Sequence, residues 1–277
     1  AEFSKLSFGR RAVMKKNNSV IFLLTSQIPK KFSIEIKLEN TEQHLANVIG
    51  VLRGKNLKAK GDIQNEDIVV FAAHYDHIGV GKPVNGDSIY NGANDDASGT
   101  TAVIMLAKYL KQLNNNERTI VFVAFTAEEI GGYGSQYFSK QLNADKVVAM
   151  FNIEMIGTES KWGKNSAYIT GYEKTDMGEI MNHDLKNSQF TFYPDPYPDQ
   201  QLFYRSDNAT LAALGVPAHT ISTSKMDSEP NYHKQSDSIE TLDLKNMTEI
   251  IKAIAISSKS IVAGEATPSR VKVSDLR

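Results

Sequence analysis

The chain has 277 residues, of which 41% are hydrophobic and 23% charged, with a formal net charge of −1. This balance gives no overall field that would favour nucleic acid or a membrane surface, and no apolar run approaches the ~18 residues of a membrane span. Because the chain has no cysteine, disulfides and thiolate chemistry are excluded, and any metal has to be held by histidine and carboxylate side chains.

The first predicted element is a strand over residues 31–40, where hydrophobic and polar residues alternate. Alternation of this kind is typical of a half-exposed strand at the edge of a sheet. We expect residues 1–45 to form N-terminal strands of a single catalytic domain that spans residues 1–277. The chain opens without the apolar segment of a signal peptide. We therefore expect a longer precursor that has lost its signal, and an extracytoplasmic location, either periplasmic or secreted.

Uncharged hydrophobic runs predict buried strands further along the chain, and helical spacing of hydrophobic residues predicts helices between them. Strands are expected over residues 46–54, 67–76, 118–126, 146–157, 166–172 and 216–223. Helices are expected over residues 95–113, 131–142, 206–214 and 242–262. This alternation predicts an α/β fold, with a mixed, centrally parallel β-sheet and helices on both faces. Ligands in such sheets bind beyond the carboxyl ends of the central strands.

Side chains of the kinds that can bind metals follow three of the predicted buried strands and occur again in two loops. They are His74, Asp76 and His77, then Glu128 and Glu129, then Glu154, and in the loops Asp95 and His233. Each group has a simpler explanation by itself: a hydrogen-bonded histidine, a helix cap for the Asp95–Asp96 pair, or a solvated turn. Because the groups recur at the same topological place, we favour a shared site. Histidine and carboxylate without cysteine suit a catalytic, hydrolytic zinc ion.

Six motifs resemble those of the dizinc aminopeptidases of the bacterial leucyl aminopeptidase and aminopeptidase Y type. In the order of that family they are HYDH (74–77), NGANDDASGT (91–100), TAEEIGGYGS (126–135), FNIEMIG (151–157), YRSD (204–207) and PNYHKQSDSIETLD (230–243). Together they extend over most of the chain. The resemblance implies a zinc-exopeptidase fold of the phosphorylase/hydrolase-like kind.

The resemblance also implies two zinc ions per chain. His74 and Glu154 would bind one ion, Glu129 and His233 the other, and Asp95 would bridge the two. The peptide bond after Asp95 is expected to be cis, as it often is in that family.

Two acidic residues have expected roles beside the metal ligands. Asp76 lies two residues after His74, so on an extended backbone both face the same side. We expect its carboxylate to accept the second N–H of the imidazole. Glu128 is expected to stay unligated and to act as the general base. It would take a proton from the water activated by the two zinc ions and later pass it to the leaving amine. His77 has no ligand role in the resemblance and is interpreted as a loop residue.

Two positions depart from the family's pattern, one that bears on zinc occupancy or spacing and one in the loop that shapes the substrate side. Glu154 stands where the peptidases usually have aspartate, and Asn208 stands where they often have histidine. Tyr204, Arg205 and Tyr232 are candidates to contact the substrate, with simple packing as the alternative. The loops that would wall the site contain Phe203, Tyr204, Met226 and Tyr232.

The predicted function is a zinc-dependent aminopeptidase that acts on the N-termini of peptides or proteins and prefers an apolar first side chain. Neither nucleic acid nor a membrane span is expected among its partners. One alternative is a glutaminyl cyclase-like acyl transferase with a similar ligand set. Another is a zinc-bound, non-catalytic binding domain. Glu128 argues against this last alternative, because a non-catalytic relative has no need for a base.

Overall fold

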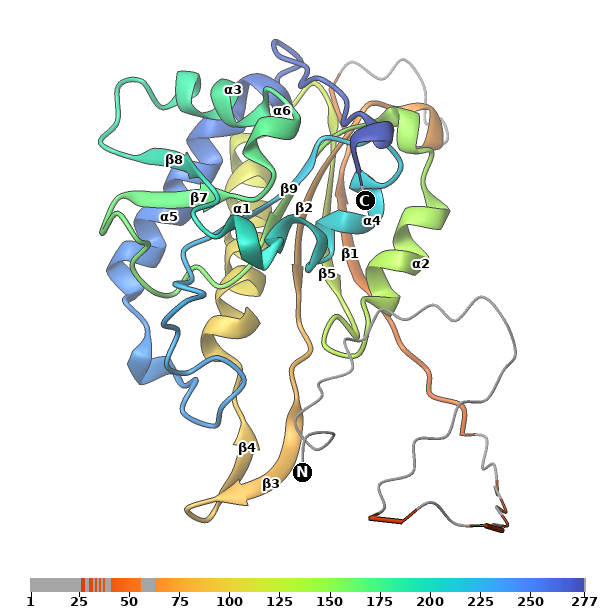
Figure 1. Cartoon of the computed structure of the whole chain (residues 1–277). Coiled ribbons are helices and arrows are strands. Elements are labelled where there is room, and N and C mark those ends of the chain that lie inside the picture. Colours follow the sequence, from red (N-terminus) through yellow and green to blue (C-terminus); the bar gives the residue numbers. More distant parts are fainter. Residues whose placement is uncertain are drawn as a thin grey trace. The chain divides into compact units, whose positions relative to one another are not determined.

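A computed structural model describes residues 26, 27, 30, 31, 33, 35, 37, 41–55 and 63–276. Its contacts divide the chain into two units, Ala1–His44 and Leu45–Arg277. The fold described here is that of the second unit (Figure 1). The strand expected over residues 31–40 lies largely outside the described residues. Within the described ranges, no helix has the length and apolar character needed to cross a membrane.

A seven-stranded sheet forms the centre of the second unit, in the order β1-β5-β2-β6-β9-β7-β8. Its strands are β1 (Val48–Leu52), β2 (Ile68–His74), β5 (Thr119–Phe125), β6 (Val147–Ile153), β7 (Ser166–Ile169), β8 (Thr191–Pro194) and β9 (Ala218–Ser222). The central strands β5, β2, β6 and β9 run parallel. β1 is antiparallel to β5, and β7 is antiparallel to β9. The prediction of a mixed sheet with a parallel centre is confirmed.

Helices cover both faces of this sheet (Figure 1). They are α1 (Ser98–Leu113), α2 (Tyr133–Gln141), α3 (Met177–Asp184), α4 (Asn208–Ala212), α5 (Leu244–Ser257) and α6 (Lys259–Val262). A hydrophobic core lies on each face of the sheet. β2 contributes residues to both cores, because successive strand residues point to opposite faces. Val69, Phe71 and Ala73 join the cluster that includes α1, α3 and α5. Ile68, Val70 and Ala72 join the cluster that includes residues of α2 and α4.

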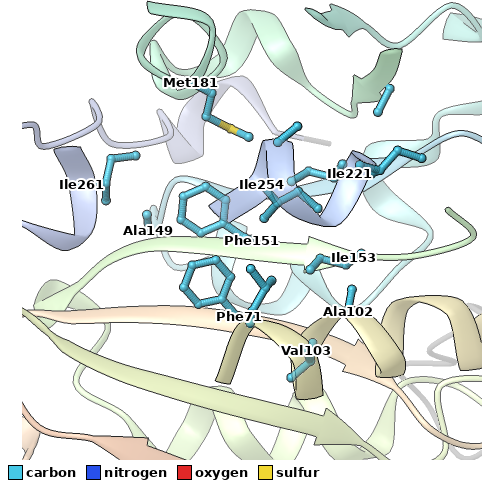
Figure 2. Packing of buried hydrophobic residues seen from close by; sticks show 14 of the residues in the cluster. Phe71, Ala102, Val103, Ala149, Phe151, Ile153, Met181, Ile221, Ile254 and Ile261 are labelled. Carbon is cyan, nitrogen blue, oxygen red and sulfur yellow. The ribbon is translucent and has the colours of Figure 1, made fainter. Parts of the chain in front are cut away.

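In the larger core Phe71 stacks between two other rings, and its contact with Phe151 is visible in Figure 2. Its ring centroid lies 4.9 Å from that of Phe151 and 5.8 Å from that of Phe122. Because these residues belong to the adjacent strands β2, β6 and β5, the stack fixes the strands whose carboxyl ends carry the expected ligands.

Several elements differ from the prediction. A second sheet consists of the hairpin β3 (Gly79–Val84) and β4 (Asp87–Tyr90), which was not expected, and neither were α3 and β8. The expected helix over residues 242–262 is divided into α5 and α6. The helix expected from residue 95 begins at Ser98, because Asp95 and Asp96 have non-helical backbone angles.

Candidate metal centre

The carboxyl ends of β5, β2 and β6 lie side by side and bring the expected ligands together. His74 is the last residue of β2 and pairs in register with Phe125, the last residue of β5. Glu128 and Glu129 follow β5 within one turn, and Glu154 follows β6 directly. In the sheet β2 lies between β5 and β6. The chain therefore continues from β2 to the strand on one side and then to the strand on the other, so the strand order reverses at this point. This is where open α/β sheets bind ligands.

His74, Asp95 and Glu154 form a first group whose ligand atoms lie within 4.8 Å of one another. His74 is 1% exposed, and its Nε2 lies 3.2 Å from Asp95 Oδ1 without making a hydrogen bond of ordinary geometry. The other ring nitrogen, Nδ1, is 3.0 Å from the backbone carbonyl of Asp76. The carbonyl fixes the proton on Nδ1 and leaves Nε2 able to bind a metal.

His233 and Glu129 form a second group on the other side of Asp95. His233 Nε2 lies 3.2 Å from Asp95 Oδ2 and 3.2 Å from Glu129 Oε2. Asp95 therefore directs one carboxylate oxygen at each group. Zinc bonds of about 2.0–2.2 Å in tetrahedral geometry place two ligand atoms roughly 3.3 Å apart. The donor atoms and their spacing thus fit zinc in both groups.

The loop that carries Asp95 is held by carboxylates from two directions. Asp237 accepts the backbone N–H groups of Asn94 at 2.8 Å and Asp95 at 3.0 Å. Asp96 accepts the N–H of Gly99 at 3.0 Å, near the start of α1, and the N–H of Met155 at 3.0 Å. The Asp95–Asp96 peptide is cis, as expected. Of the two neighbouring aspartates, only Asp95 faces the metal groups, and Asp96 serves as a cap.

The carboxylate of Asp76 makes contacts other than those expected. It lies 3.7 Å from His74 Nδ1, which bonds the Asp76 carbonyl instead. Its two oxygens accept the backbone N–H groups of Glu128 at 3.1 Å and Glu129 at 3.3 Å. The tight turn after β5 leaves these N–H groups without a strand partner, and a carboxylate with two oxygens satisfies both. Asp76 therefore holds the turn that presents the two glutamates.

The centre concentrates negative charge out of water. Burial, reinforced by the charge of Glu154, raises the pKa of Glu128 to about 9. Burial also raises the pKa of Glu154 to about 7, although His74 opposes this. For Asp95 burial acts in the same direction, but contacts with His233 and His74 outweigh it and hold the pKa well below its usual range. A divalent cation in each group would offset these charges and favour the ionised carboxylates.

A pocket opens beside the two groups, lined on one side by Asp95, Glu128, Glu154 and His233. Three residues were candidates to contact the substrate. Two of them, Arg205 and Tyr232, also line this pocket. Apolar and hydroxyl side chains complete the lining: Met155, Leu202, Met226, Tyr168, Thr170, Ser206, Thr220 and Ser222.

Phe203 and Tyr204, which were expected to wall the site, are not among the residues that line the pocket. Phe203 is 4% exposed and packs against His219, and the Tyr204 ring lies against Phe203. For these two residues the alternative of simple packing is the one observed.

Asn208, one of the two departures from the family's pattern, is fully buried and binds the backbone. It donates to the carbonyls of Phe203 at 3.0 Å and Ala218 at 3.3 Å, and it accepts the hydroxyl of Thr220 at 2.9 Å. These bonds tie the loop that carries Arg205 to β9. Asn208 therefore holds one wall of the pocket in place.

Two residues near the candidate ligands were given no role in the centre by sequence reasoning. Asp207 is 2% exposed, and burial raises its pKa to about 6. Asp207 ends the YRSD motif, but the motif by itself does not indicate that this carboxylate is buried. The imidazole of His77 lies beside Glu129, with Nδ1 2.8 Å from Oε1. The sequence did indicate His77, because it stands only three residues after His74, just beyond the end of β2.

Known proteins resemble this chain in sequence. The model of Peptidase family M28 matches residues 47–257. Aminopeptidase YwaD of Bacillus subtilis (strain 168) is 27% identical over 240 residues, which cover 84% of this chain and 48% of YwaD. The chain spans about half the length of the curated relatives it matches.

Solved structures show the same fold. The structure of BSAP, a zinc aminopeptidase from Bacillus subtilis, matches with a TM-score of 0.62 and 24% identity, over 83% of this chain and 52% of that one. The glutaminyl cyclase of Porphyromonas gingivalis matches with a TM-score of 0.58 and 18% identity, over 78% of this chain and 77% of that one. Since the family model extends over most of the chain and contains the motifs that form the two groups, the chain belongs to peptidase family M28.

Proposed function

We propose that the chain is a zinc-dependent aminopeptidase that hydrolyses the first peptide bond of peptides or proteins and holds two zinc ions. His74 and Glu154 would hold one ion and Glu129 and His233 the other, with Asp95 shared. The proposal is supported by the 3.2 Å spacing of donor atoms in both groups. When bound, zinc lowers the pKa of water and polarises a carbonyl group.

Glu128 is the proposed general base. It lines the pocket, and its carboxylate belongs to neither group of candidate ligands. In its ionised form it takes a proton from the attacking water, and in its protonated form it gives that proton to the leaving amine. Burial raises its pKa, which makes the ionised carboxylate a stronger acceptor of the proton from water, and a nearby divalent charge would favour that ionised form.

The observation that carries the aminopeptidase proposal is the pairing of Glu128 with Glu154 in the pocket wall. A free N-terminus brings a positive charge, and these two carboxylates provide a negative surface for it. Met155, Leu202 and Met226 in the same pocket would receive an apolar first side chain. An acetylated or internal residue has no charge to place there.

Matched peptides test this proposal. The zinc-loaded protein is incubated with a peptide that begins with leucine, with its N-acetylated form, and with a peptide that begins with glutamine. Products are identified by mass spectrometry. We expect stepwise release of leucine from the free peptide and no cleavage of the acetylated one.

Each other product pattern would overturn the proposal in a different way. Equal cleavage of the free and acetylated peptides, or cuts at internal bonds, would leave a zinc hydrolase that is not an aminopeptidase. Loss of ammonia from the glutamine peptide without hydrolysis would identify a glutaminyl cyclase-like acyl transferase instead.

A further inference from the structure

His77 has the position of a metal ligand. Its side chain is 8% exposed, and its Nδ1 lies 2.8 Å from Glu129 Oε1 and 3.9 Å from Asp95 Oδ2. His77, Asp95 and Glu129 each offer one ligand atom, and these atoms lie within 4.8 Å of one another. Their grouping resembles that of His74, Asp95 and Glu154 on the other side of Asp95.

His77 lies close to carboxylates, but within the described parts of the chain its ring nitrogens lack hydrogen bonds of ordinary geometry. His219 shows the contrast, because it is 1% exposed and both of its ring nitrogens are bonded. Its Nδ1 lies 2.8 Å from the carbonyl of Thr170, and its Nε2 lies 2.8 Å from the Thr175 hydroxyl. Buried polar groups are normally satisfied in this way, so the ring of His77 calls for another partner.

The His77 ring is fixed in place by its neighbours. It packs over the bare α-carbon of Gly92, where a Cβ would lie 2.6 Å from His77 Cγ. It also meets the ring of His233 edge-on, with 5.7 Å between centroids. The two imidazoles approach different oxygens of Glu129, His77 facing Oε1 and His233 facing Oε2.

We propose that His77 is an additional ligand of the second metal position, which it binds through Nδ1 together with Asp95, Glu129 and His233. The proposal rests on the metal site of the proposed function. It makes the two positions unequal, because the second has four protein ligands, two of them imidazoles, while the first has His74, Glu154 and Asp95. The second position therefore binds its ion more tightly and fills first.

A direct test is available because the chain has six histidines. The protein is labelled with ¹⁵N-histidine and loaded with ¹¹³Cd²⁺ in place of zinc, and scalar coupling between cadmium and nitrogen is measured by NMR. Coupling is seen only across a metal–nitrogen bond. We expect it for His74 Nε2, His233 Nε2 and His77 Nδ1, with the His77 signal assigned by its loss in His77→Gln. His219 should show none.

The outcomes separate this inference from the function on which it rests. Coupling at His74 and His233 but not at His77 would leave the two-ion site and overturn the role of His77 as a ligand. Coupling at none of the three would overturn the proposed metal site itself.

Metal affinity provides a second measurement. Zinc is titrated against a chromophoric chelator with the wild type, His77→Gln and the control His183→Gln, whose side chain is 73% exposed on α3. Loss of outer-sphere partners typically lowers metal affinity 10–100-fold, so loss of a ligand should weaken the tighter site by more than about 100-fold. The control should match the wild type. Unchanged tight-site affinity in a folded His77→Gln protein would refute the proposal.

Discussion

Glu128 and Glu129 are adjacent in sequence and still have different surroundings. Glu129 Oε2 lies 3.2 Å from His233 Nε2, while Glu128 lines the pocket. The backbone between β5 and α2 makes this possible, because Ala127 has a positive φ of 58° and the chain turns sharply there. Contacts with His233 and His77 overcome the effect of burial and lower the pKa of Glu129 to about 2, whereas the pKa of Glu128 is raised. One residue is thus prepared to bind a cation and the other to carry a proton.

Replacing Glu128 by glutamine should remove turnover and leave metal binding in place. The amide has nearly the same shape but cannot accept the proton, and the loss of a general base typically costs 10²–10⁴-fold. We expect a kcat lower by about this factor and a zinc content per chain equal to that of the wild type, measured by mass spectrometry of the metal. A Glu128→Gln protein with near-normal kcat would show that another group is the base.

The neighbouring substitution is the matched control. Glu129→Gln introduces the same chemical change one residue later, but it should act through the metal. We expect lower zinc content and recovery of part of the activity at high zinc concentration. If both variants lose zinc equally, the division of roles between the two residues is wrong.

At the residue scale, the sequence predicted which candidate ligands lie close together, but not the contacts of the residues beside them. His74, Glu129 and Glu154 follow buried strands, and strand ends converge for topological reasons. The contacts of Asp76 and His77 depend on where the chain bends after β2, which no residue pattern specifies. Asp76 bonds backbone N–H groups 52 and 53 residues away in sequence, and such contacts appear only when the fold is known.

At the scale of elements, the turn between β5 and α2 depends on a carboxylate from another strand. Asp76 accepts two of its N–H groups. In Asp76→Asn one oxygen becomes an NH₂ group, which cannot accept a hydrogen bond and faces an N–H donor. We expect the glutamates to shift and kcat to fall about 10–100-fold, since small misplacements of reacting groups have effects of this size.

The control for this prediction is Asp87→Asn, at the exposed first residue of β4, where kcat should stay within about 2-fold of the wild type. Zinc content should be similar in all three proteins, because Asp76 is not among the grouped ligand atoms. A large loss of zinc in Asp76→Asn would mean that its carboxylate supports the metal directly.

The β3–β4 hairpin shows why some elements could not be predicted from hydrophobic patterning. Most residues of β3 are exposed, so neither alternation nor an apolar run identifies it, and Pro83 argues against a strand. The sequence does contain a pattern that indicates the turn between β3 and β4. Asn85 and Gly86 have φ values of 52° and 88°, which is the backbone that the Asn-Gly pair favours in two-residue hairpins.

At the scale of the whole molecule, the buried acids should make the metal-free protein less stable as pH rises. The pKa values of Glu128, Glu154 and Asp207 are raised to about 9, about 7 and about 6, first of all by burial. Above the ordinary pKa of each acid, the unfolded chain has lost a proton that the folded chain still holds. Unfolding then becomes more favourable with each rise in pH, until the raised pKa is passed.

The two ligand histidines act in the same direction above their ordinary pKa of 6.5. Contacts with Asp95 and Glu129 raise the pKa of His233 to about 9. Burial lowers the pKa of His74, but Asp95 and other carboxylates raise it more. We expect the Tm of the chelator-treated protein to fall by roughly 5 °C or more between about pH 5 and pH 8, as followed by calorimetry.

Zinc should change this dependence, because the cation takes the place of the protons. Ligands bind metal in their deprotonated forms, so the rise in Tm on adding zinc should grow with pH. A metal-free Tm that is constant or rises over the same range would contradict the pKa shifts on which this prediction depends.

The expected ligands come from five separate places along the chain, from residue 74 to residue 233. An ion shared among them would close several long loops at once, as a set of cross-links does. Because the chain has no cysteine, these cross-links would be coordinate bonds, which reducing agents leave intact and chelators remove. The durability of the folded protein would then follow the supply of metal in its surroundings and would be indifferent to their redox state.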